Sequence, residues 1–471
     1  MKRPWLTTSL ISVIAVISAV GIHHEAHMEL VRGLSSFRAA LPAGTTFTYS
    51  SAKPAIFARG ALLTNVTLHT SAVTFRATQM RLGHPRTTPD GGIGINSLEI
   101  HNPSLQTASL LVHASSLSLH RLTLPPSHER HPGPVAIDPA RTLLDHLLVE
   151  HLSVQNLSHT SDAMPVSPLA PVHMHSLTLN TFSVDNYGPS HLTTGTIQGA
   201  TVAYTRMTQQ SVSPSATQSG QLTFDHAQFQ QQDFANYVGA LKAHRELDES
   251  GLPPRQLDVR NLRVNGTGGT FWIDEITGNG TSDDGKSHFQ QTWKGLHFRS
   301  MKPLPFRIDG QHSIFQATQD YSSVDQIAHI QGTLTIPALT QVIATADLHF
   351  QHGSAARAPL NTMRIANLAV RMEKGDRLLQ RFFMFSARQA QNVVPADELR
   401  NQALRMLTPA VSHNAQLAPL PDYLLNPANR NLTLSYRPVV PVPARTLAFV
   451  LSQPLTFMAF LTSPDVRAVA E

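Results

Sequence analysis

Apolar and polar residues alternate along most of the chain, but the alternation breaks at recurring places. In "LTLNTFSVDN" (177–186), apolar residues stand at Leu177 and Leu179, two polar residues follow, and alternation resumes at Phe182 and Val184. Strict alternation is typical of a strand with one apolar face. One extra residue would turn the second run of side chains to the opposite face unless the backbone compensates. The pattern therefore predicts strands that are kinked once along their length.

The same pattern, apolar-x-apolar-x-x-apolar-x-apolar, recurs along the chain. Copies stand at 61–68, 98–105, 117–124, 147–154, 177–184, 195–202, 222–229, 257–264 and 363–370. Ala, Gly or Pro weakens four of them. We expect a β-bulge at each break, because a bulge absorbs the extra residue, returns both runs to one face and bends the strand. A two-residue hairpin is the alternative, but the arms are short and the central pairs lack the Asn-Gly type that tight hairpins prefer.

The fold class expected from this pattern is mainly β: an N-terminal membrane helix, a long bent antiparallel sheet with repeated bulged strands, and a few helices. One helix is expected at 233–249, where Asp233 can act as the N-cap of an apolar stripe. A second helical region is expected at about 377–408. Within it, Pro395 suits the first turn of a helix, and the acidic residues that follow suit a helix N-terminus. The apolar stretch 446–460 is too short to span a bilayer, and we expect a buried helix or strand there.

The first residues resemble a targeting or anchoring segment. Lys2 and Arg3 precede 17 uncharged residues at 6–22. A helix of that length spans roughly 25 Å, close to the thickness of a bilayer core. We expect either an uncleaved signal-anchor or a cleaved signal peptide. The basic residues before the segment place the bulk of the chain outside the cytoplasm.

A resemblance to a known family follows from these features together. The chain has a basic tip, one apolar segment and then hundreds of residues of the style of "LDVRNLRV" (257–264), which precedes "NGTGGTFWIDEITGNG" (265–280). This architecture resembles the AsmA/YdgA-like proteins of bacterial envelopes. The resemblance implies an inner-membrane-anchored protein whose bulk lies in the periplasm. Some members of the broader group are thought to guide lipids along an apolar β-groove.

Three regions are expected along the chain. Residues 1–28 form the signal-anchor or signal peptide, residues 29–375 form a repetitive β-rich periplasmic region, and residues 376–471 form a C-terminal region of helices and strands. Spacings between pattern copies vary, so a solenoid with identical coils is not expected.

Composition narrows the function classes. The chain is 41% hydrophobic and 14% charged, with a formal net charge of +5. Its basic residues are scattered and do not interleave with aromatic residues, so no nucleic-acid partner is expected. Without cysteine, disulfides and thiolate sites are excluded. The 25 histidines would add much positive charge in mildly acidic surroundings.

Motifs of catalysis and cofactor binding are missing from the sequence. It has no G-x-S-x-G elbow, Walker A loop or G-x-G-x-x-G turn. "NGTGGTF" (265–271) is expected to be a loop between strands, and "GNGTSDDGK" (278–286) lacks calcium-loop spacing. "HHEAH" (23–27) and "HMH" (173–175) are weak zinc patterns. We expect no enzyme activity, no cofactor and no metal site.

The leading hypothesis is a non-enzymatic envelope protein that binds or conducts lipid along an apolar β-groove. The alternative is a β-scaffold that docks a protein partner of the envelope. The partners expected are therefore membrane lipid, both at the anchor and as an acyl-chain ligand, or an envelope protein. The candidate lipid-binding residues are Leu117, Leu119, Leu122, Leu124, Leu177, Leu179, Phe182, Val184, Leu257, Val259, Leu262 and Val264. A closed β core would use the same residues.

Overall fold

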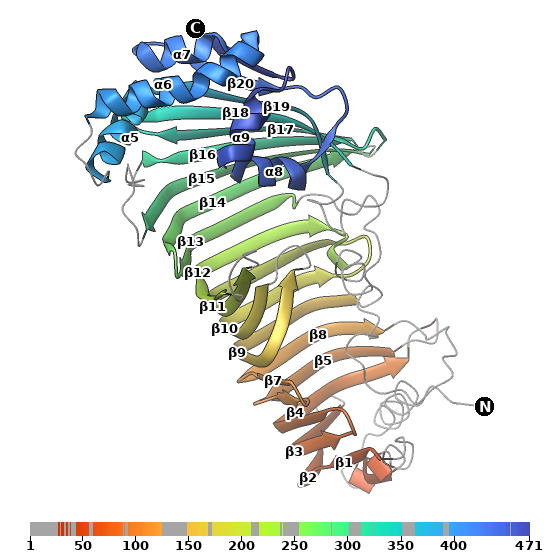
Figure 1. Cartoon of the computed structure of the whole chain (residues 1–471). Coiled ribbons are helices and arrows are strands. Elements are labelled where there is room, and N and C mark those ends of the chain that lie inside the picture. The colour runs from red at the N-terminus through yellow and green to blue at the C-terminus, as the bar shows by residue number, and fades with distance from the viewer. Residues whose placement is uncertain are drawn as a thin grey trace. The chain divides into compact units, whose positions relative to one another are not determined.

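The computed structural model describes most of the chain. The described residues are 27–38 in part, 44–55, 60–87, 89, 93–124, 148–167, 172–208, 216–235, 238, 254–283, 285–300, 312–322, 324–350, 363–389, 395–452 and 454–471. Within them, 22 strands belong to an antiparallel sheet, which confirms the predicted mainly-β fold (Figure 1). No helix in these ranges is long and apolar enough to cross a membrane, and the predicted anchor at 6–22 lies outside them.

The chain divides into two compact units. The first comprises Met1–Ser167 and Pro171–Arg245, and the second comprises Pro168–Ala170 and Glu246–Glu471. The C-terminal helices belong to the same unit as the strands that precede them. The boundary expected after residue 375 stays a prediction.

The first unit is an up-and-down meander. β1 and β2 pair with the two halves of β3, which pairs with β4. β5 and β6 pair with successive parts of β4, β8 and β7 with successive parts of β9, and β9 to β12 continue in order. The strands are β1 (Thr46–Thr48), β2 (Ser51–Ala55), β3 (Gly60–His69), β4 (Thr74–Thr87), β5 (Ile93–His101), β6 (Ser104–Gln106), β7 (Leu110–His113), β8 (Ser116–Leu124), β9 (Leu148–Ser167), β10 (Val172–Tyr187), β11 (Leu192–Thr208) and β12 (Ala216–Gln232).

The second unit repeats this simple order. Each strand from β13 to β19 pairs with the next, β19 pairs with β20 and β21, and β20 pairs with β22. The strands are β13 (Gln256–Gly266), β14 (Gly269–Asp283), β15 (Lys286–Ser300), β16 (Ile314–Ser322), β17 (Ile327–Ile336), β18 (Thr340–His349), β19 (Arg364–Glu373), β20 (Leu432–Tyr436), β21 (Val442–Pro443) and β22 (Val466–Ala470). Of the loop expected at 265–271, only residues 267–268 form the turn that joins β13 to β14, and the residues on either side are paired in the two strands.

Helices follow β19, as predicted. They are α5 (Asp376–Gln389), α6 (Ala396–His413), the 3-10 helix η5 (Ala415–Leu417), α7 (Pro419–Leu425), α8 (Ala444–Ser452) and α9 (Pro454–Leu461). Pro395 is the N-cap of α6 rather than its first helical residue, and Asp397 and Glu398 stand in the first turn. The stretch 446–460 forms most of α8 and α9, with Leu447 and Leu461 buried. The helix expected at 233–249 begins at Phe234, and most of its length lies outside the described residues.

A line of kinks crosses the strands of the first unit and explains the broken pattern. At one level, consecutive strands each carry a residue that interrupts the ladder: Ser50, Asn65, Thr78, Asn102, Ser115, Asn156, Asn180, Gly199 and Asp225. In alternate strands this residue has a left-handed backbone, with φ between +46° and +61°. Asn and Gly are the residues that accept this conformation most readily.

Side chains hold the kinks in place. Asn102 Nδ2 donates to Thr78 Oγ1 at 3.2 Å, and that hydroxyl donates to the carbonyl of His101 at 3.0 Å. Asn156 Nδ2 donates to Ser115 Oγ at 3.0 Å, and that hydroxyl donates to the carbonyl of Gln155 at 3.1 Å. The hydroxyl of the short polar residue thus accepts from the side-chain amide of the kinked residue and donates to the carbonyl of the residue before it.

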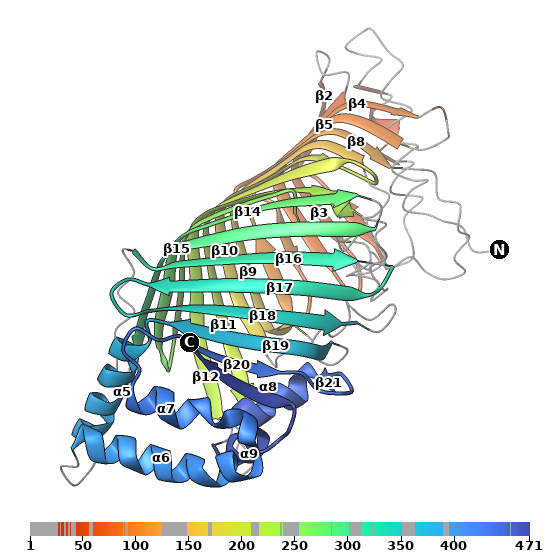
Figure 2. The same ribbon diagram turned by 90° about the horizontal axis from the view of Figure 1, so that it is seen from above.

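The predicted one-sided bulge is mostly wrong in its form, although its position is right. Leu179 pairs with Ala200 and Thr181 with Gln198, so Asn180 and Gly199 face each other and the register is unchanged. Because both strands carry the extra residue at the same level, neither slips against the other. A one-sided irregularity does occur between β18 and β19, where Ala366 has no partner. In both forms the two apolar runs return to one face, and the strands curve along their length (Figure 2).

Gly199 offers a test of the kink line. Its φ is +61°, and a Cβ there would lie 2.1 Å from Nδ2 of Asn180. We expect Gly199→Ala to lower the free energy of unfolding by roughly 1–3 kcal/mol, through backbone strain and this clash. Urea unfolding measures the change.

Two matched variants separate these causes. Asn180→Ala combined with Gly199→Ala removes the clash and leaves the strain, so part of the loss should return. Gly266→Ala, where a Cβ meets nothing within 4 Å, serves as the control. An unchanged midpoint for Gly199→Ala would contradict the role given to the kink.

Candidate functional site

Apolar residues form continuous rows across one face of the first unit. Residues directly opposite each other in antiparallel strands share a face, so the register defines the rows. One row runs Leu63, Met80, Ile100, Leu117, Val154, Phe182, Ile197 and Ala227. The next runs Ala61, Leu82, Leu98, Leu119, Leu152, Val184, Gly195 and Phe229. We call this surface the apolar face of the first unit.

The kink keeps both halves of each strand on this face. Leu119 and Leu122 are three positions apart, which would place them on opposite faces of a regular strand, yet they pack in one cluster with Ile95 and Val149. Arg121, one of the two residues between them, has φ +48°. The predicted residues of β8 and β10 are thus brought together: Leu122, Leu179 and Val184 are buried, and Leu117, Leu119, Leu177 and Phe182 are half-buried. Leu124 stands opposite Ile93 in the register.

The second unit has its own apolar face. Val259 lies in a row with Ile276, Trp293, Phe315, Leu334, Val342, Met372, Leu432 and Ala470. Leu257 stands opposite Gly278, Leu262 opposite Ile273 and Val264 opposite Phe271. All four predicted residues of β13 are half-buried. Gly278 lies under the ring of Phe289, where a Cβ would come within 2.8 Å.

Helices cover part of each apolar face. In the second unit, Leu417, Tyr423 and Leu461 are buried in one cluster with β17 to β20 and β22, and the helices lie over these strands in Figure 1. In the first unit, Leu30 and Leu34 are buried against β3 and β4. Of the predicted residues, Leu117 packs against the cluster of Leu30 and Leu34, and most of the predicted residues of β8, β10 and β13 keep part of their surface exposed.

One histidine interrupts the apolar face of the first unit. His159 stands in a cross-strand row between Val112 and Leu177 and is 8% exposed. Its Nδ1 is buried with no hydrogen-bond partner. Burial penalises the charged imidazolium and lowers the pKa of His159. A neutral imidazole therefore takes the place of an aliphatic side chain at neutral pH.

The opposite face of the first unit is polar and has a cavity. A second line of kinks, with positive φ at His84, Arg121 and Asn186, crosses β4, β8 and β10. Beside it lies a polar cavity of about 550 Å³, whose lining residues are Asn96, His120, Arg121, Glu150, His151, Asp185 and Asn186. Arg121 pairs with Glu150 at 3.0 Å, and His151 Nδ1 lies 2.5 Å from Asp185 Oδ1. Arg121 and Glu150 thus compensate each other's charge in this cavity.

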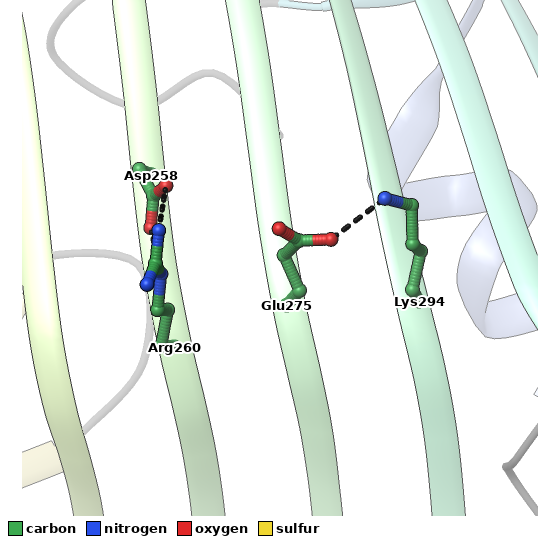
Figure 3. Close-up of polar contacts among 4 residues, drawn as sticks. All are labelled: Asp258, Arg260, Glu275 and Lys294. Atoms are coloured by element: carbon green, nitrogen blue, oxygen red, sulfur yellow. Dashed lines mark hydrogen bonds and ion pairs between the residues drawn. The ribbon is translucent and has the colours of Figure 1, made fainter.

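Charged residues form short rows on the second unit. Arg260, Glu275 and Lys294 stand side by side on β13, β14 and β15 (Figure 3). Lys294 Nζ donates to Glu275 Oε2 at 2.7 Å, and Arg260 Nε donates to Asp258 Oδ1 at 3.1 Å along its own strand. These exposed pairs contribute little to stability, and they keep this row polar.

A histidine–aspartate row crosses β15 to β18. His288 Nδ1 lies 2.6 Å from Asp320 Oδ1, and His329 Nδ1 lies 2.7 Å from Asp347 Oδ1. Burial raises the pKa of Asp347, but hydrogen bonds from His329 and Asn367 outweigh it, and the net pKa lies below the usual aspartate value. Among the described residues, no group of three His, Asp or Glu side chains is placed to hold a metal ion. Of the two histidine motifs, His175 contacts Thr205 Oγ1 at 2.6 Å, and only His27 of 23–27 is described.

Sequence reasoning missed the polar cavity. Its residues include the two polar pairs that break the pattern in β8 and β9, His120-Arg121 and Glu150-His151. The ionisable residues at those breaks were the signal in the sequence that could have indicated a polar site. The sequence does not show that the two pairs lie next to each other, because this depends on the register between strands that residues 125–147 separate.

His159 predicts a pH dependence of stability. Its folded pKa is below the unfolded value near 6.5, so the unfolded chain takes up a proton first as the pH falls. Stability is therefore full above the unfolded pKa and is lost as the pH falls through it. We expect His159→Leu to stabilise the protein more at pH 5 than at pH 8, measured by thermal unfolding. The exposed His120→Leu is the control, and an equal gain at both pH values would contradict the assignment.

Comparison with known proteins adds no information on the family or function of this chain. No protein-family model matches the chain, and no curated protein matches it. The proposals below therefore depend on the geometry of the chain and on the resemblance of its sequence pattern.

Proposed function

We propose that this protein is a non-enzymatic protein of the bacterial envelope that binds acyl chains of lipids on its apolar faces. The carrying observation is the continuity of the apolar rows: in the first unit, eight aligned positions in each of two adjacent rows present apolar or small side chains. In this proposal residues 6–22 anchor the chain in the inner membrane and the remainder lies in the periplasm. A secreted form after cleavage is the alternative location.

Partition into an apolar surface is the mechanism we propose. Each methylene moved from water to such a surface contributes about 0.8 kcal/mol, so a long acyl chain is held without any directed contact. Neighbouring strands are about 4.8 Å apart, and the part of the row from β8 to β12, beyond the strands that Leu30 and Leu34 cover, therefore offers a path of roughly 19 Å. Because successive positions of a row are chemically alike, an acyl chain can move along it without breaking a specific bond.

The polar residues at the kinks support this use of the face. At Asn102 and Asn156 the kink is stabilised by side-chain hydrogen bonds to Thr78 and Ser115. These bonds satisfy part of the hydrogen-bonding capacity of the kink, which lowers the cost of placing an acyl chain beside it. Phe182 belongs to the first apolar row and Leu119 to the second, and both are half-buried. We assign these two residues to direct lipid contact.

A scaffold that docks a protein partner is the second candidate. Val439 and Val440, between β20 and β21, are 93% and 67% exposed, and Met406 on α6 is 64% exposed. Exposed apolar side chains of this kind are common at protein interfaces. None of these residues belongs to the predicted stretch 446–460, in which Leu447 is buried.

Charge introduced into the apolar rows tests the proposal. We expect the purified full-length chain to carry phospholipid or fatty acid, detected by native mass spectrometry and lipid extraction. Phe182→Glu and Leu119→Glu should each reduce the bound lipid at least tenfold, because a carboxylate in the row must be desolvated by an acyl chain.

Neighbouring serines provide the matched controls. Ser183→Glu and Ser118→Glu add the same charge to the same strands on the opposite face, and lipid should remain bound. Wild-type protein free of lipid, or equal loss in both pairs of variants, would reject the acyl-chain proposal. In that case crosslinking from Val440 would search for the protein partner.

A further inference from the structure

Helix α5 presents a basic stripe on its exposed side. Arg377, Arg381 and Arg388 are exposed and are spaced by four and seven residues, which places them on one side of the helix. Met384 lies within the same stripe and is 43% exposed. The opposite side of the helix packs inward through Leu379 and the buried Phe383.

Carboxylates near α5 are engaged elsewhere. Asp376, in the first turn, lies close enough to the buried Tyr423 to help raise the pKa of that phenol, after the larger effect of burial. On α6, Glu398 pairs with Arg405, and Asp397 lies 3.6 Å from Arg400. Among the described residues, no carboxylate forms an ion pair with the three arginines of the stripe. Arg377 Nη1 donates to the carbonyl of Ala338 at 3.3 Å, and this bond leaves its charge uncompensated.

One apolar side chain accompanies these charges within the stripe, the exposed Met384. Phe382 is also exposed, but it lies about 100° around the helix from Arg381 and so outside the stripe. Arginines beside an exposed methionine, on a helix that lies on the protein surface, combine electrostatic attraction with shallow apolar insertion. An anionic lipid surface matches both properties, since it offers negative headgroups above an acyl layer.

We propose that α5 docks on an anionic lipid bilayer. The guanidinium groups of Arg377, Arg381 and Arg388 lie at the phosphate level, and Met384 enters the headgroup boundary. This docking is separate from acyl-chain binding on the apolar faces, because it uses the outward side of a helix that covers such a face. It gives the second unit a membrane contact of its own, independent of residues 6–22.

The absence of cysteine makes a site-specific test possible. Met384→Cys in the full-length chain carries one environment-sensitive fluorophore, and the protein is reconstituted in vesicles of phosphatidylcholine alone or mixed with phosphatidylglycerol. We expect nitroxide-bearing lipids to quench the label in the mixed vesicles and not in the neutral ones, and high salt to reverse the quenching. Changing the three arginines to glutamine should weaken docking on the order of a hundredfold, at roughly fivefold for each basic residue.

Two controls locate the effect on the stripe. A label at Met406→Cys on α6 should stay unquenched in both vesicles. Changing the exposed Arg76, Arg263 and Arg299 to glutamine lowers the net charge equally, and it should leave docking intact. An unquenched label at position 384, or equal quenching in both kinds of vesicle, would overturn the proposal. Protection of the label by added polyglutamate but not by lipid would also overturn it, and would indicate that the stripe binds an acidic polypeptide. Acyl-chain binding is measured separately by lipid extraction, so each proposal can fail alone.

Discussion

The pairing of kinks across neighbouring strands is the constraint on which the first unit depends. A single extra residue in one strand would shift the register and turn half of the apolar side chains to the other face. The same extra residue opposite another, as at Asn180 and Gly199, leaves the register unchanged. Every strand of the meander must therefore carry the irregularity at the same level, and the line from Ser50 to Asp225 meets that requirement.

The residue types at the kinks lower the energetic cost of the kinked backbone. A left-handed backbone costs about 1–2 kcal/mol for most residues, and Asn and Gly reduce that cost. Asn102 and Asn156 also use their amides to bond the hydroxyl of the neighbouring strand. At Gly199 the geometry is different, since the side chain of Asn180 occupies the space where a Cβ would stand. The left-handed residues of the kink line are thus accommodated in two ways, by side-chain hydrogen bonds at Asn102 and Asn156 and by the lack of a Cβ at Gly199.

The kinks also organise the two faces of the sheet. On one face they align the apolar rows that we assign to acyl chains. On the other face the second line places Arg121 beside Glu150 at the polar cavity. The helices then limit how much of the apolar face stays exposed, because Tyr423 and Leu417 are buried against the last strands of the second unit.

The sequence by itself determined many of the strands, the position of the kink wherever the broken pattern occurs, and the apolar face, because alternation and its interruption are local properties of the chain. Kinks at Thr78, Asn156 and Asn186 stand outside the copies of the pattern. Leu177, Leu179, Phe182 and Val184 were predicted from spacing alone, and helix over about 377–408 was predicted with Pro395 and the acidic residues after it as its start signals. The structure corrected the form of the kink: a one-sided bulge and a paired kink have the same pattern in one strand, and only the neighbouring strand distinguishes them. The cavity at Arg121 and the outward direction of the α5 arginines were likewise decided by tertiary structure. Both depend on which residues stand opposite each other or pack beneath them, and such contacts between distant segments leave no periodic signal in the sequence.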